Sequence, residues 1–595
     1  MPLYADNAKD STTTTGTGSF TLVGTIIPGY RTIASCSEIP NGKTTKVFIE
    51  DSSGNWEIAE AMLDRSVVST GILTITTVKY SSNNNNIVSF GDGIKYISIV
   101  SDVNDLVVNF DYVSDIPTNF IGVSRIGKDL YVGNNDEDGI KPVGTIAPIN
   151  IPTGFRWTNP PINIKRWGNN ILTDFDITDY VPTTSNVYYL DPVNGLDTNS
   201  GARATPLKNL YSALYRPGVI KIIIINLTAD YIARGIQSWN QAAPAQSHSV
   251  IVEGNYRYIS VMTTNSSAPT WTVNGTYSNV YQTALATANC TGVTDLKTTK
   301  PLTYVDKNRV TQTINYVKWY DTYNVVTSLA LVASTPGSWY NDGTVCYVNP
   351  RDGRSLVKDT YMQPTGNSSN MRFPSVNNMT VYAQGIDFVG GRPIDSIIAS
   401  SVTDTILALN NCSVQGGGNT GTGKGMNISA FQNVYTYRCL AASNFTDGFS
   451  YHSYEGDGTT PNTSPNFIEI ENVAVANGTT GSSDSSSNAT TSHDYCNGIR
   501  INCIYINSDD RPVADTNYAY TWTIGGYVGQ AVQTSSAQSI AAVASGTKMW
   551  VDSFYAQPGV NPRWISVTGA TISYFNSGLV VNDPTGGGII KSYYG

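Results

Sequence analysis

One short pattern returns five times between about Val381 and Asn507, and its spacing constrains the fold more than any other feature. Short apolar segments of period two surround each occurrence, and no helical pattern separates them. A recurrence of about 30 residues is typical of a solenoid in which each repeat forms one coil of strands. The sequence therefore predicts an all-β fold whose main body is a β-helix. The equivalent positions lie 27, 27, 33 and 31 residues apart and are Gly385, Cys412, Cys439, Asn472 and Cys503.

The longer repeats predict where a functional site lies. Equivalent residues of stacked coils are about 4.8 Å apart, the spacing of hydrogen-bonded strands. If the strands stay in register, the extra residues must bulge at the turns on one side of the solenoid. These bulges are residues 443–462, 477–498 and 507–517, and they contain two of the three histidines. Their acidic and imidazole side chains are the candidate site residues: Asp447, His452, Glu455, His493, Asp494 and Asp515.

Composition limits the partners that the chain can have. Only 14% of the residues are charged, against about a quarter in a typical globular protein. The formal net charge of -9 gives no electrostatic reason to bind nucleic acid or an anionic membrane. The most apolar run, Val219 to Leu227, is too short to cross a bilayer, and Met1 to Gly18 lacks the apolar core of a secretory signal. The seven cysteines have no CxxC spacing, so we predict buried thiols and neither a metal site nor a cofactor.

The first hundred residues carry a set of short motifs. Their order and spacing resemble an N-terminal module of bacteriophage tail and other virion proteins, although Ala59 stands where that module usually has Gly. The resemblance implies that residues 1–104 form a small β-rich attachment domain, which docks on virion tail or portal-adaptor proteins. An unrelated small β-sandwich is the alternative. The motifs are Leu3-Tyr4-Ala5-Asp6, Thr12 to Gly18, Gly29-Tyr30-Arg31-Thr32, Asn55-Trp56-Glu57, Ser81-Ser82-Asn83 and Gly93-Ile94-Lys95.

The rest of the chain divides into three segments. Residues 105–184 have neither a repeat nor strong periodicity and contain recurring prolines, so we predict a connector. The run from Tyr188 to Asp197 resembles the opening of pectate-lyase-like right-handed parallel β-helices, which implies a solenoid over residues 185–531. Residues 532–595 are predicted to form a C-terminal cap or a trimerisation region.

An open end of a β-helix must be covered, because it exposes unpaired backbone groups and apolar stacks. Apolar residues recur at helical spacing soon after the first predicted strand, and we expect them to form the inner face of a helical lid. They are Leu207, Leu210, Tyr211 and Leu214.

Acids and imidazoles along one edge of a β-helix suit polysaccharide cleavage. A glycoside hydrolase needs a carboxylic acid that protonates the leaving oxygen and a second carboxylate, roughly 5.5 Å away in a retaining enzyme and roughly 6.5–9.5 Å away in an inverting one. A lyase needs instead a base and a cation that stabilises a carboxylate. Asp447 is the first choice for acid or base, although an Asp that caps its own turn explains it equally well. His452 is either a catalytic imidazole or an ordinary hydrogen-bonded loop histidine.

The second focus is Ser492-His493-Asp494. A histidine beside an aspartate can act as a tuned acid or base, but neighbours in an extended strand point to opposite faces. By the same rule Glu469 and Glu471 share one face, and Ile470 takes the other. Since Ile470 is expected in the core, we predict that both glutamates face solvent.

The segments 446–452 and 488–494 resemble parts of β-helix proteins of the bacteriophage tailspike type. This resemblance implies a homotrimeric virion component that binds and depolymerises a bacterial capsule or lipopolysaccharide at the outer surface of the host cell. Hydrolysis is favoured over elimination because acids outnumber bases in the bulges. Two alternatives stay open: a non-catalytic adhesin that only grips the glycan, and a polysaccharide lyase.

Overall fold

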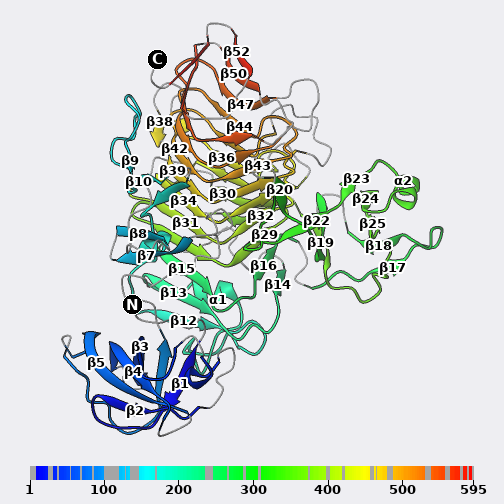
Figure 1. The fold of residues 1–595 in the computed structure, drawn as a ribbon. Helices are drawn as coiled ribbons and strands as arrows, with labels where there is room; N and C mark the ends of the chain where they lie inside the picture. The colour runs from blue at the N-terminus through cyan, green and yellow to red at the C-terminus, as the bar shows by residue number, and fades with distance from the viewer. Residues whose placement is uncertain are drawn as a thin grey trace. The chain divides into compact units, whose positions relative to one another are not determined.

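A computed structural model of the chain forms two compact units, Met1–Ala147 and Pro148–Gly595 (Figure 1). The chain is nearly all β, with 4% helix, and its main body is a parallel β-solenoid of about ten turns. The predicted fold class is thereby confirmed. Among the described residues, no helix is both long and apolar enough to cross a membrane. The structure describes every residue except 1–7, 25–30, 37–38, 52, 54, 67–69, 84–85, 100–119, 127–128, 135–146, 168–169, 235–245, 264–266, 286–289, 306–309, 367, 373–375, 397–402, 419–422, 430, 456–460, 464, 479–486, 530–537, 557–562, 568, 576–580, 586–587 and 593–595.

The first unit is built on a six-stranded antiparallel sheet, as a β-rich N-terminal domain requires. One face of the sheet buries a small apolar core that includes Phe20, Val47 and Leu73. Two of the motifs that suggest a virion module, at residues 3–6 and at Gly29-Tyr30, lie outside the described residues. The strand order is β1 (Lys9–Thr12), β6 (Lys95–Ile99), β3 (Lys43–Asp51), β4 (Trp56–Asp64), β5 (Ile72–Ser81) and β2 (Ser19–Thr21); a 3-10 turn spans Ile33–Ser35, and a hairpin joins β7 (Phe120–Ile126) to β8 (Asp129–Asn134).

The solenoid of the second unit has three parallel sheets, and each full coil contributes one strand to each sheet. The first sheet consists of β12 (Val187–Leu190), β13 (Ile220–Ile224), β15 (His248–Val252), β28 (Thr380–Gln384), β31 (Ile406–Asn410), β34 (Asn433–Tyr437), β39 (Asn466–Ile470), β42 (Asn497–Ile501), β45 (Tyr520–Ile524), β48 (Lys548–Asp552), β51 (Thr571–Phe575) and β53 (Ile589–Ser592). The second sheet consists of β14 (Tyr231–Arg234), β16 (Tyr258–Val261), β29 (Ile386–Val389), β32 (Ser413–Gln415), β35 (Leu440–Ala442), β40 (Val473–Val475), β43 (Ile504–Ile506), β46 (Tyr527–Val528) and β49 (Tyr555–Ala556). The third sheet consists of β27 (Ser369–Arg372), β30 (Arg392–Ser396), β33 (Met426–Ile428), β36 (Phe449–Tyr451), β41 (Thr490–Ser492), β44 (Val513–Thr516), β47 (Gln538–Val543), β50 (Arg563–Val567) and β52 (Val581–Thr585).

These ladders run through the segment 532–595, for which the sequence predicts a cap or a trimerisation region. Strands β48, β51 and β53 extend the first sheet, and β47, β50 and β52 extend the third. The described part of this segment therefore continues the coil. Helix α1 (Leu210–Leu214) lies against β12 and β13 at the other end, where the lid is predicted. Leu210 and Leu214 are buried in the solenoid core, whereas Tyr211 faces outward and packs on Tyr215.

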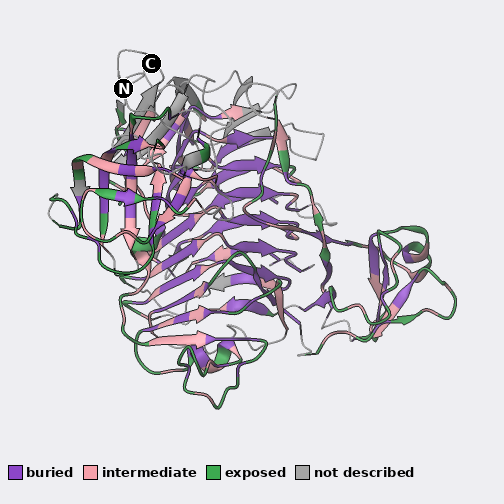
Figure 2. Ribbon diagram, turned by 60° about the horizontal axis from the view of Figure 1, so that its bottom comes forward, coloured by how far each residue is buried: buried purple, intermediate pink, exposed green. Residues whose placement is uncertain are grey.

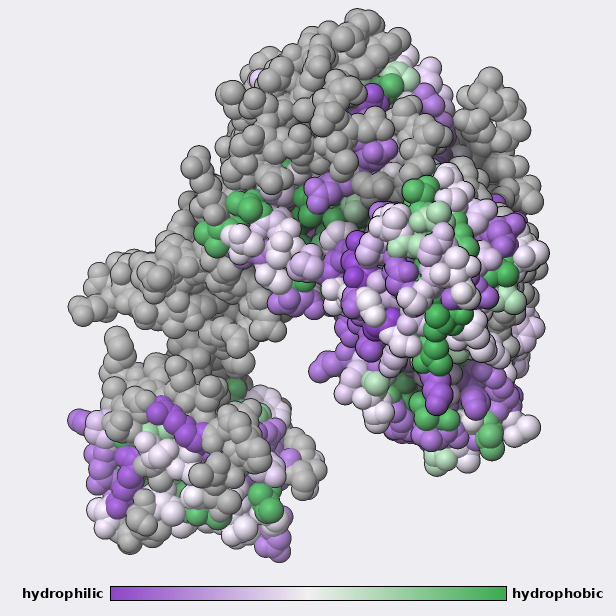
Figure 3. All heavy atoms as spheres, turned by 90° about the vertical axis from the view of Figure 1, so that its right-hand side faces the viewer, coloured by the Kyte–Doolittle hydropathy of each residue, from purple (hydrophilic) through white to green (hydrophobic). Residues whose placement is uncertain are grey.

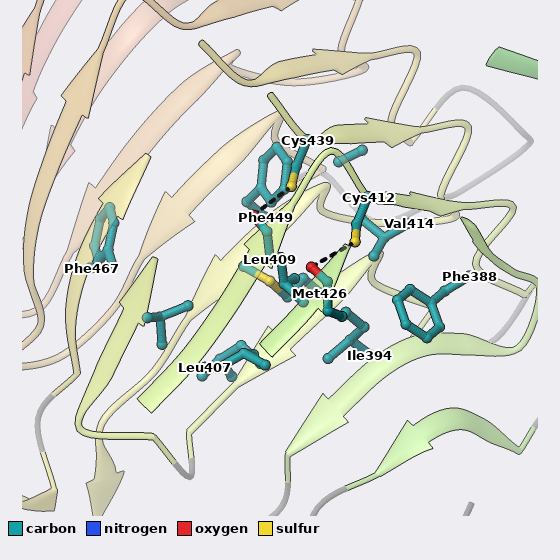
Figure 4. Packing of buried hydrophobic residues seen from close by; sticks show 14 of the residues in the cluster. Phe388, Ile394, Leu407, Leu409, Cys412, Val414, Met426, Cys439, Phe449 and Phe467 are labelled. Atoms are coloured by element: carbon teal, nitrogen blue, oxygen red, sulfur yellow. Dashed lines mark hydrogen bonds between the residues drawn. The ribbon is translucent and has the colours of Figure 1, made fainter. Parts of the chain in front are cut away.

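The repeated cysteines point into the solenoid. Cys412, Cys439 and Cys503 belong to one buried apolar cluster, and Figure 4 shows the first two among Leu409, Val414 and Phe449. The register corrects one position of the repeat. Asp387 pairs with Ser413, so Ile386 and not Gly385 stands in the cysteine column.

Each coil passes from the first sheet to the second through one residue in the left-handed region of backbone space. Asn and Gly tolerate this conformation, and a bulky residue there costs free energy unless its surroundings fix it. Two such bulky residues, Arg438 and Glu471, form an ion pair across adjacent coils at 2.7 Å. The turn residues are Gly385, Asn411, Arg438, Glu471, Asn502, Gly525 and Ser553, with φ between 50° and 75°.

The interior holds a polar network that the sequence does not predict. The Arg500 guanidinium binds both carboxylate oxygens of Asp515, at 3.0 and 2.9 Å, and its Nε lies 3.7 Å from Glu469. Tyr505 and Thr490 donate hydrogen bonds to Glu469. The side chains of Arg500, Asp515 and Glu469 are all fully buried, and the bidentate pair with Asp515 compensates the Arg500 charge, whose Nε has only the longer contact with Glu469.

Two sequence predictions are corrected here. Glu469 points into the solenoid and not to solvent, because Ile468 and Ile470 take the outward positions and are buried there by another segment. Asp515 is likewise an interior residue. Burial alone would raise the pKa of its carboxyl, but the Arg500 guanidinium and the hydrogen bonds from Ser492 and Thr521 bring it below the ordinary value.

Residues 149–181, within the predicted connector, cover the outer face of the first sheet. Phe155, Ile164, Ile171 and Ile177 pack on outward side chains of seven successive coils. Arg156 fastens this cover by hydrogen bonds to the backbone oxygens of three residues at a solenoid corner. The cover contains β9 (Ala147–Ile149), β10 (Ile164–Trp167), β11 (Asn170–Thr173) and the 3-10 helix η3 (Ile177–Tyr180). Because the cover shields this face of the sheet from solvent, the outward side chains there are mainly apolar. They include Tyr382, Ala408, Tyr435, Ile468, Ile499 and Trp522.

A long insertion between β16 and β27 covers the second sheet and also projects from the solenoid (Figures 1 and 2). Its hairpin packs Leu302, Ile314 and Val317 on the outer face of β35, β40, β43 and β46. The insertion contains β17 (Thr272–Val273), β18 (Tyr281–Ala284), β19 (Gly292–Lys300), β20 (Thr303–Val305), β21 (Thr311–Thr313), β22 (Trp319–Thr322), β23 (Asn324–Val325), α2 (Leu329–Ser334), β24 (Ser338–Asn341), β25 (Val345–Asn349) and β26 (Met362–Thr365). On the face drawn in Figure 3, hydrophobic residues form small separate patches among hydrophilic ones.

The buried ion pair gives a stability prediction. Replacing Asp515 by Asn leaves the Arg500 charge without its bidentate partner, and breaking a buried pair in this way costs roughly 3–5 kcal/mol. The matched control is Glu471→Gln, which breaks a partly exposed pair with Arg438 and costs about 1 kcal/mol or less. Denaturant unfolding followed by circular dichroism measures both. Equal effects of the two substitutions would contradict the interior placement of Asp515.

Candidate functional site

The candidate site lies on the outer face of the third sheet, over β33, β36, β41 and β44. Phe449 and Tyr451 pair with Thr490 and Ser492, so the residues between them, Ser450 and Thr491, come side by side on the outward face. The register places side chains at both ends of these strands in columns. His452 and His493 follow the strands on adjacent coils, and the residues two positions before the four strands are Lys424, Asp447, Asn488 and Arg511.

Asp447 is held by groups from the neighbouring coils. The backbone N–H and the side-chain amide of Asn488 donate to its Oδ1 at 3.0 and 3.2 Å. Its Oδ2 has only longer contacts, with the Lys424 ammonium at 3.4 Å and the Ser450 hydroxyl at 3.5 Å. The partners of this carboxylate thus lie mainly on other coils, and Oδ2 is the oxygen that retains capacity for a further hydrogen bond.

The two histidines of the bulges stack on each other. Their ring centroids are 4.3 Å apart, and the rings are inclined by 15°. The Lys424 ammonium lies 2.8 Å from His452 Nε2 and 3.1 Å from the Ser450 hydroxyl. Since an ammonium only donates, His452 Nε2 accepts, and the neutral ring carries its proton on Nδ1. His493 Nε2 lies 3.2 Å from the Thr491 hydroxyl.

Both rings are neutral at neutral pH. Burial is the main cause that lowers the pKa of His452 well below its ordinary value, and the charge of Lys424 and the neighbouring His493 lower it further. Burial and Lys424 lower the pKa of His493 to about 4, against the opposing effect of Asp447 and Asp515. The cluster therefore contains two imidazoles that accept protons only in acid.

A second acidic residue, Asp510, lies near Asp447 and is not among the site residues predicted from the sequence. Asp510 precedes β44, and its backbone N–H donates to Ser487 O. Burial raises the pKa of its carboxyl; the Arg511 guanidinium, 3.8 Å away, lowers it, while the charges of Asp509 and Asp447 raise it again. Three consecutive charged residues in a chain with few charges were the available signal. The structure thus brings a carboxyl with a raised pKa close enough to Asp447 for the charge of Asp447 to contribute to the shift.

The remaining candidates lie elsewhere. Asp515 is the interior partner of Arg500 and has no part in this surface. Asp494 lies at the next corner of the coil, partly exposed, with φ at 59°. Glu455 belongs to the short strand β37 (Tyr454–Glu455), which pairs with β38 (Pro461–Thr463), and its side chain is outside the described residues. The structure thus brings Asp447, His452 and His493 together and separates Asp515 from them.

No group of three or more His, Cys, Asp or Glu side chains able to hold a metal ion occurs among the residues that the structure describes. The cluster offers a carboxyl with a raised pKa, a second carboxyl group, an ammonium and two neutral imidazoles, which can move a proton, accept one and stabilise negative charge.

The depressed pKa values of the histidines predict that the free energy of unfolding depends on pH. Because the chain has only three histidines, the titration of their rings can be measured. The pKa of His248, which is fully buried, is also lowered to about 4. In the unfolded chain all three titrate near 6.5, so the free energy of unfolding should fall as the pH drops from 6.5 towards 4. Selective labelling of the His rings should show no titration by NMR between pH 8 and 5.5. A ring of His452 or His493 that titrates near pH 6.5 would contradict the described cluster.

Comparisons with known proteins find fold-level likeness alone. No protein-family model matches the chain, and no curated protein matches it. Three solved structures align with it at 9–10% identity. A complex of XylC with xylose has a TM-score of 0.40 and covers 67% of this chain and 70% of its own. A glycoside hydrolase aligns with a TM-score of 0.39, over 69% of this chain and 96% of its own. A GH136 lacto-N-biosidase from Eubacterium ramulus aligns with a TM-score of 0.24, over 68% of this chain and 67% of its own. At these TM-scores the likeness carries no argument about activity.

Proposed function

We propose that the chain is a bacteriophage tailspike that binds a bacterial surface polysaccharide and hydrolyses it at the cluster on the third sheet. The observation that carries the hydrolytic part is the pair Asp447 and Asp510, one carboxylate held by donors and one carboxyl whose pKa is raised. A glycosidase needs these two states, an acid for the leaving oxygen and a base or nucleophile on the other side of the sugar. Asp510 takes the role of the acid and Asp447 the role of the base.

The coil spacing favours inversion over retention. Asp447 precedes β36 and Asp510 precedes β44, and β41 lies between them in the sheet. Two steps of the ladder amount to roughly 9–10 Å between the backbones, and the side chains set the separation of the two carboxyl groups. Between carboxyl groups, roughly 6.5–9.5 Å leaves room for the attacking water of an inverting enzyme, whereas roughly 5.5 Å is needed for a covalent intermediate. We infer inversion because the two aspartates do not come from adjacent coils. Asp447 Oδ2, with its long contacts, is the oxygen that would accept the proton of that water.

The other members of the cluster hold the base in place. Lys424, which precedes β33, contacts Asp447, Ser450 and His452 together, so its ammonium fixes three polar groups of the adjacent coil at β36. The stacked imidazoles flank this arrangement without adding charge at neutral pH. Lys424 beside a neutral His452 also fits the alternative of a lyase, in which the cation would stabilise a uronate and the imidazole would remove a proton.

Substitution of the two carboxylates tests the proposed roles. Asp447→Asn and Asp510→Asn should each lower the rate of glycan cleavage by at least roughly 10²-fold, the usual contribution of a general acid or base. The matched control is Asp404→Asn, an exposed aspartate of the same solenoid at φ 54°, where Asn is equally well tolerated. New reducing ends from purified capsule or lipopolysaccharide are the readout. Undiminished cleavage by both variants would remove the assignment.

The same assay separates the alternatives. Reducing ends without ultraviolet absorbance indicate hydrolysis, and reducing ends with the absorbance of unsaturated uronates indicate elimination. A polymer that is retained by the protein but stays intact indicates a non-catalytic adhesin. Anomeric NMR of the first products decides between inversion and retention.

The proposed partners and location follow from the resemblance of residues 1–104 to a virion module. In this proposal the chain is a homotrimer on the phage tail that docks on a tail or portal-adaptor protein and acts outside the host cell. Sedimentation equilibrium should give three chain masses, and a variant lacking residues 1–104 should still cleave glycan but fail to join tail particles. A monomer at micromolar concentration, or a truncated chain that still joins the particle, would contradict this part.

A further inference from the structure

Two thiols lie against each other inside the projecting part of the insertion. We call this part the lobe; it contains the five-stranded sheet β17, β18, β25, β24 and β23 together with α2. Cys290 Sγ is 3.5 Å from Cys346 Sγ, and both residues are buried, at 3% and 0% exposure. The surrounding cluster is apolar and includes Trp271, Trp339 and Val348. A disulfide sulfur pair is about 2.05 Å apart, so the two sulfurs need to approach by about 1.5 Å.

Other thiols of the chain have different surroundings. Cys412, Cys439 and Cys503 each donate to a carbonyl oxygen of a neighbouring coil, at 3.4, 3.2 and 3.5 Å. The Cys36 thiol donates to Thr32 O. These thiols have the hydrogen bonds expected of small buried core residues. In the pair Cys290 and Cys346, each sulfur has the other within contact distance, while the carbonyl oxygen nearest to the Cys290 thiol, that of Gly292, is 3.9 Å away.

We propose that Cys290 and Cys346 are an oxidation site that closes to a disulfide when the folded chain meets a peroxide. The sulfur of Cys290 attacks one peroxide oxygen, the O–O bond breaks, and the departing hydroxide takes up the thiol proton as water. The sulfur of Cys346 then attacks the Cys290 sulfenic acid, the S–S bond forms, the S–O bond breaks, and a second water leaves with the Cys346 proton. Two thiols are oxidised, and one peroxide is reduced to two waters.

The burial of the pair determines which oxidant suits it. A small neutral molecule such as hydrogen peroxide can reach a thiol that is nearly closed to solvent, whereas a bulky disulfide reagent cannot. The hydrogen bond with Cys290 and burial raise the pKa of the Cys346 thiol well above its ordinary value. The closing step therefore runs slowly at neutral pH and faster in mild alkali, because the thiolate is the attacking form.

The bond would join two sheets that the chain connects only through loops. Cys346 lies on β25 of the lobe, and Cys290 stands two residues before β19 of the three-stranded sheet β22, β19 and β26. That second sheet is anchored on the solenoid, where Tyr320 of β22 donates its hydroxyl to Asp387 of β29 and its backbone N–H to Oε1 of Gln415. A disulfide between the two sheets would fix the lobe to the solenoid and restrict a loop of 56 residues.

Thiol counting on the full-length chain tests the proposal. The native protein, purified with a reductant and then desalted, is treated with hydrogen peroxide, quenched, denatured and alkylated. The number of alkylated cysteines should fall from seven to five, and peptide mapping should find Cys290 linked to Cys346. Treatment with a reductant before alkylation should restore seven. The rate of the loss should rise between pH 7 and pH 9.

Single-serine variants provide the control for the pairing. Cys346→Ser should keep no disulfide after peroxide and should instead retain a sulfenic acid at Cys290 that dimedone traps; Cys290→Ser should keep all six thiols. Seven alkylated cysteines in the wild-type chain, at peroxide doses that already oxidise its methionines, would overturn the proposal. A link between another pair, such as Cys412 and Cys439, or oxidation of Cys290 to a sulfinic acid without a link, would overturn it as well.

Discussion

The in-register stacking of coils through parallel backbone hydrogen bonds is the constraint on which the rest of the structure depends. Each strand of a coil pairs with its equivalent in the next coil, so one residue of the repeat forms a column along the solenoid. A single-residue slip would exchange the inner and outer faces. Register thereby decides that the thiols of Cys412 and Cys439 are interior and that the rings of His452 and His493 meet outside. The site has no local sequence signature because it is assembled from four coils.

Stacking also explains where charge is tolerated inside the solenoid. Arg500, Glu469 and Asp515 come from two sheets of neighbouring coils, and the two carboxylates also accept hydrogen bonds from Ser492, Thr490 and Tyr505. An isolated ion there would carry a prohibitive desolvation cost, which the opposite charges and these hydrogen bonds offset. The outer faces show the opposite pattern, with apolar side chains in positions that would otherwise face solvent. Isoleucines and aromatic residues point outward on the first and second sheets because the connector segment and the insertion cover them, which leaves the third sheet for polar chemistry.

The sequence was sufficient for the coil and for part of the site. The spacing of Cys412, Cys439 and Cys503 predicted the columns, and the longer repeats identified the bulges that carry Asp447, His452 and His493. The sequence was insufficient to place side chains wherever an outward face of the solenoid is covered by a distant segment. Ile470 was taken as core, and that assumption placed Glu469 in solvent, because no local pattern reveals that residues 149–181 pack there. Asp515 was included for its position in a bulge although its partner Arg500 lies on another sheet, and Asp510 was missed because its raised pKa arises from burial and from charges of other turns.

In the proposed mechanism, coil stacking brings Asp447 and Asp510 to the two sides of a glycosidic bond. A crystal structure of the Asp510→Asn variant with a bound fragment of the host polysaccharide tests this arrangement. We expect a glycosidic oxygen within hydrogen-bonding distance of residue 510 and an ordered water between Asp447 and the anomeric carbon on the opposite side of the sugar. A glycan bound along another sheet, with neither carboxylate near an anomeric carbon, would contradict it.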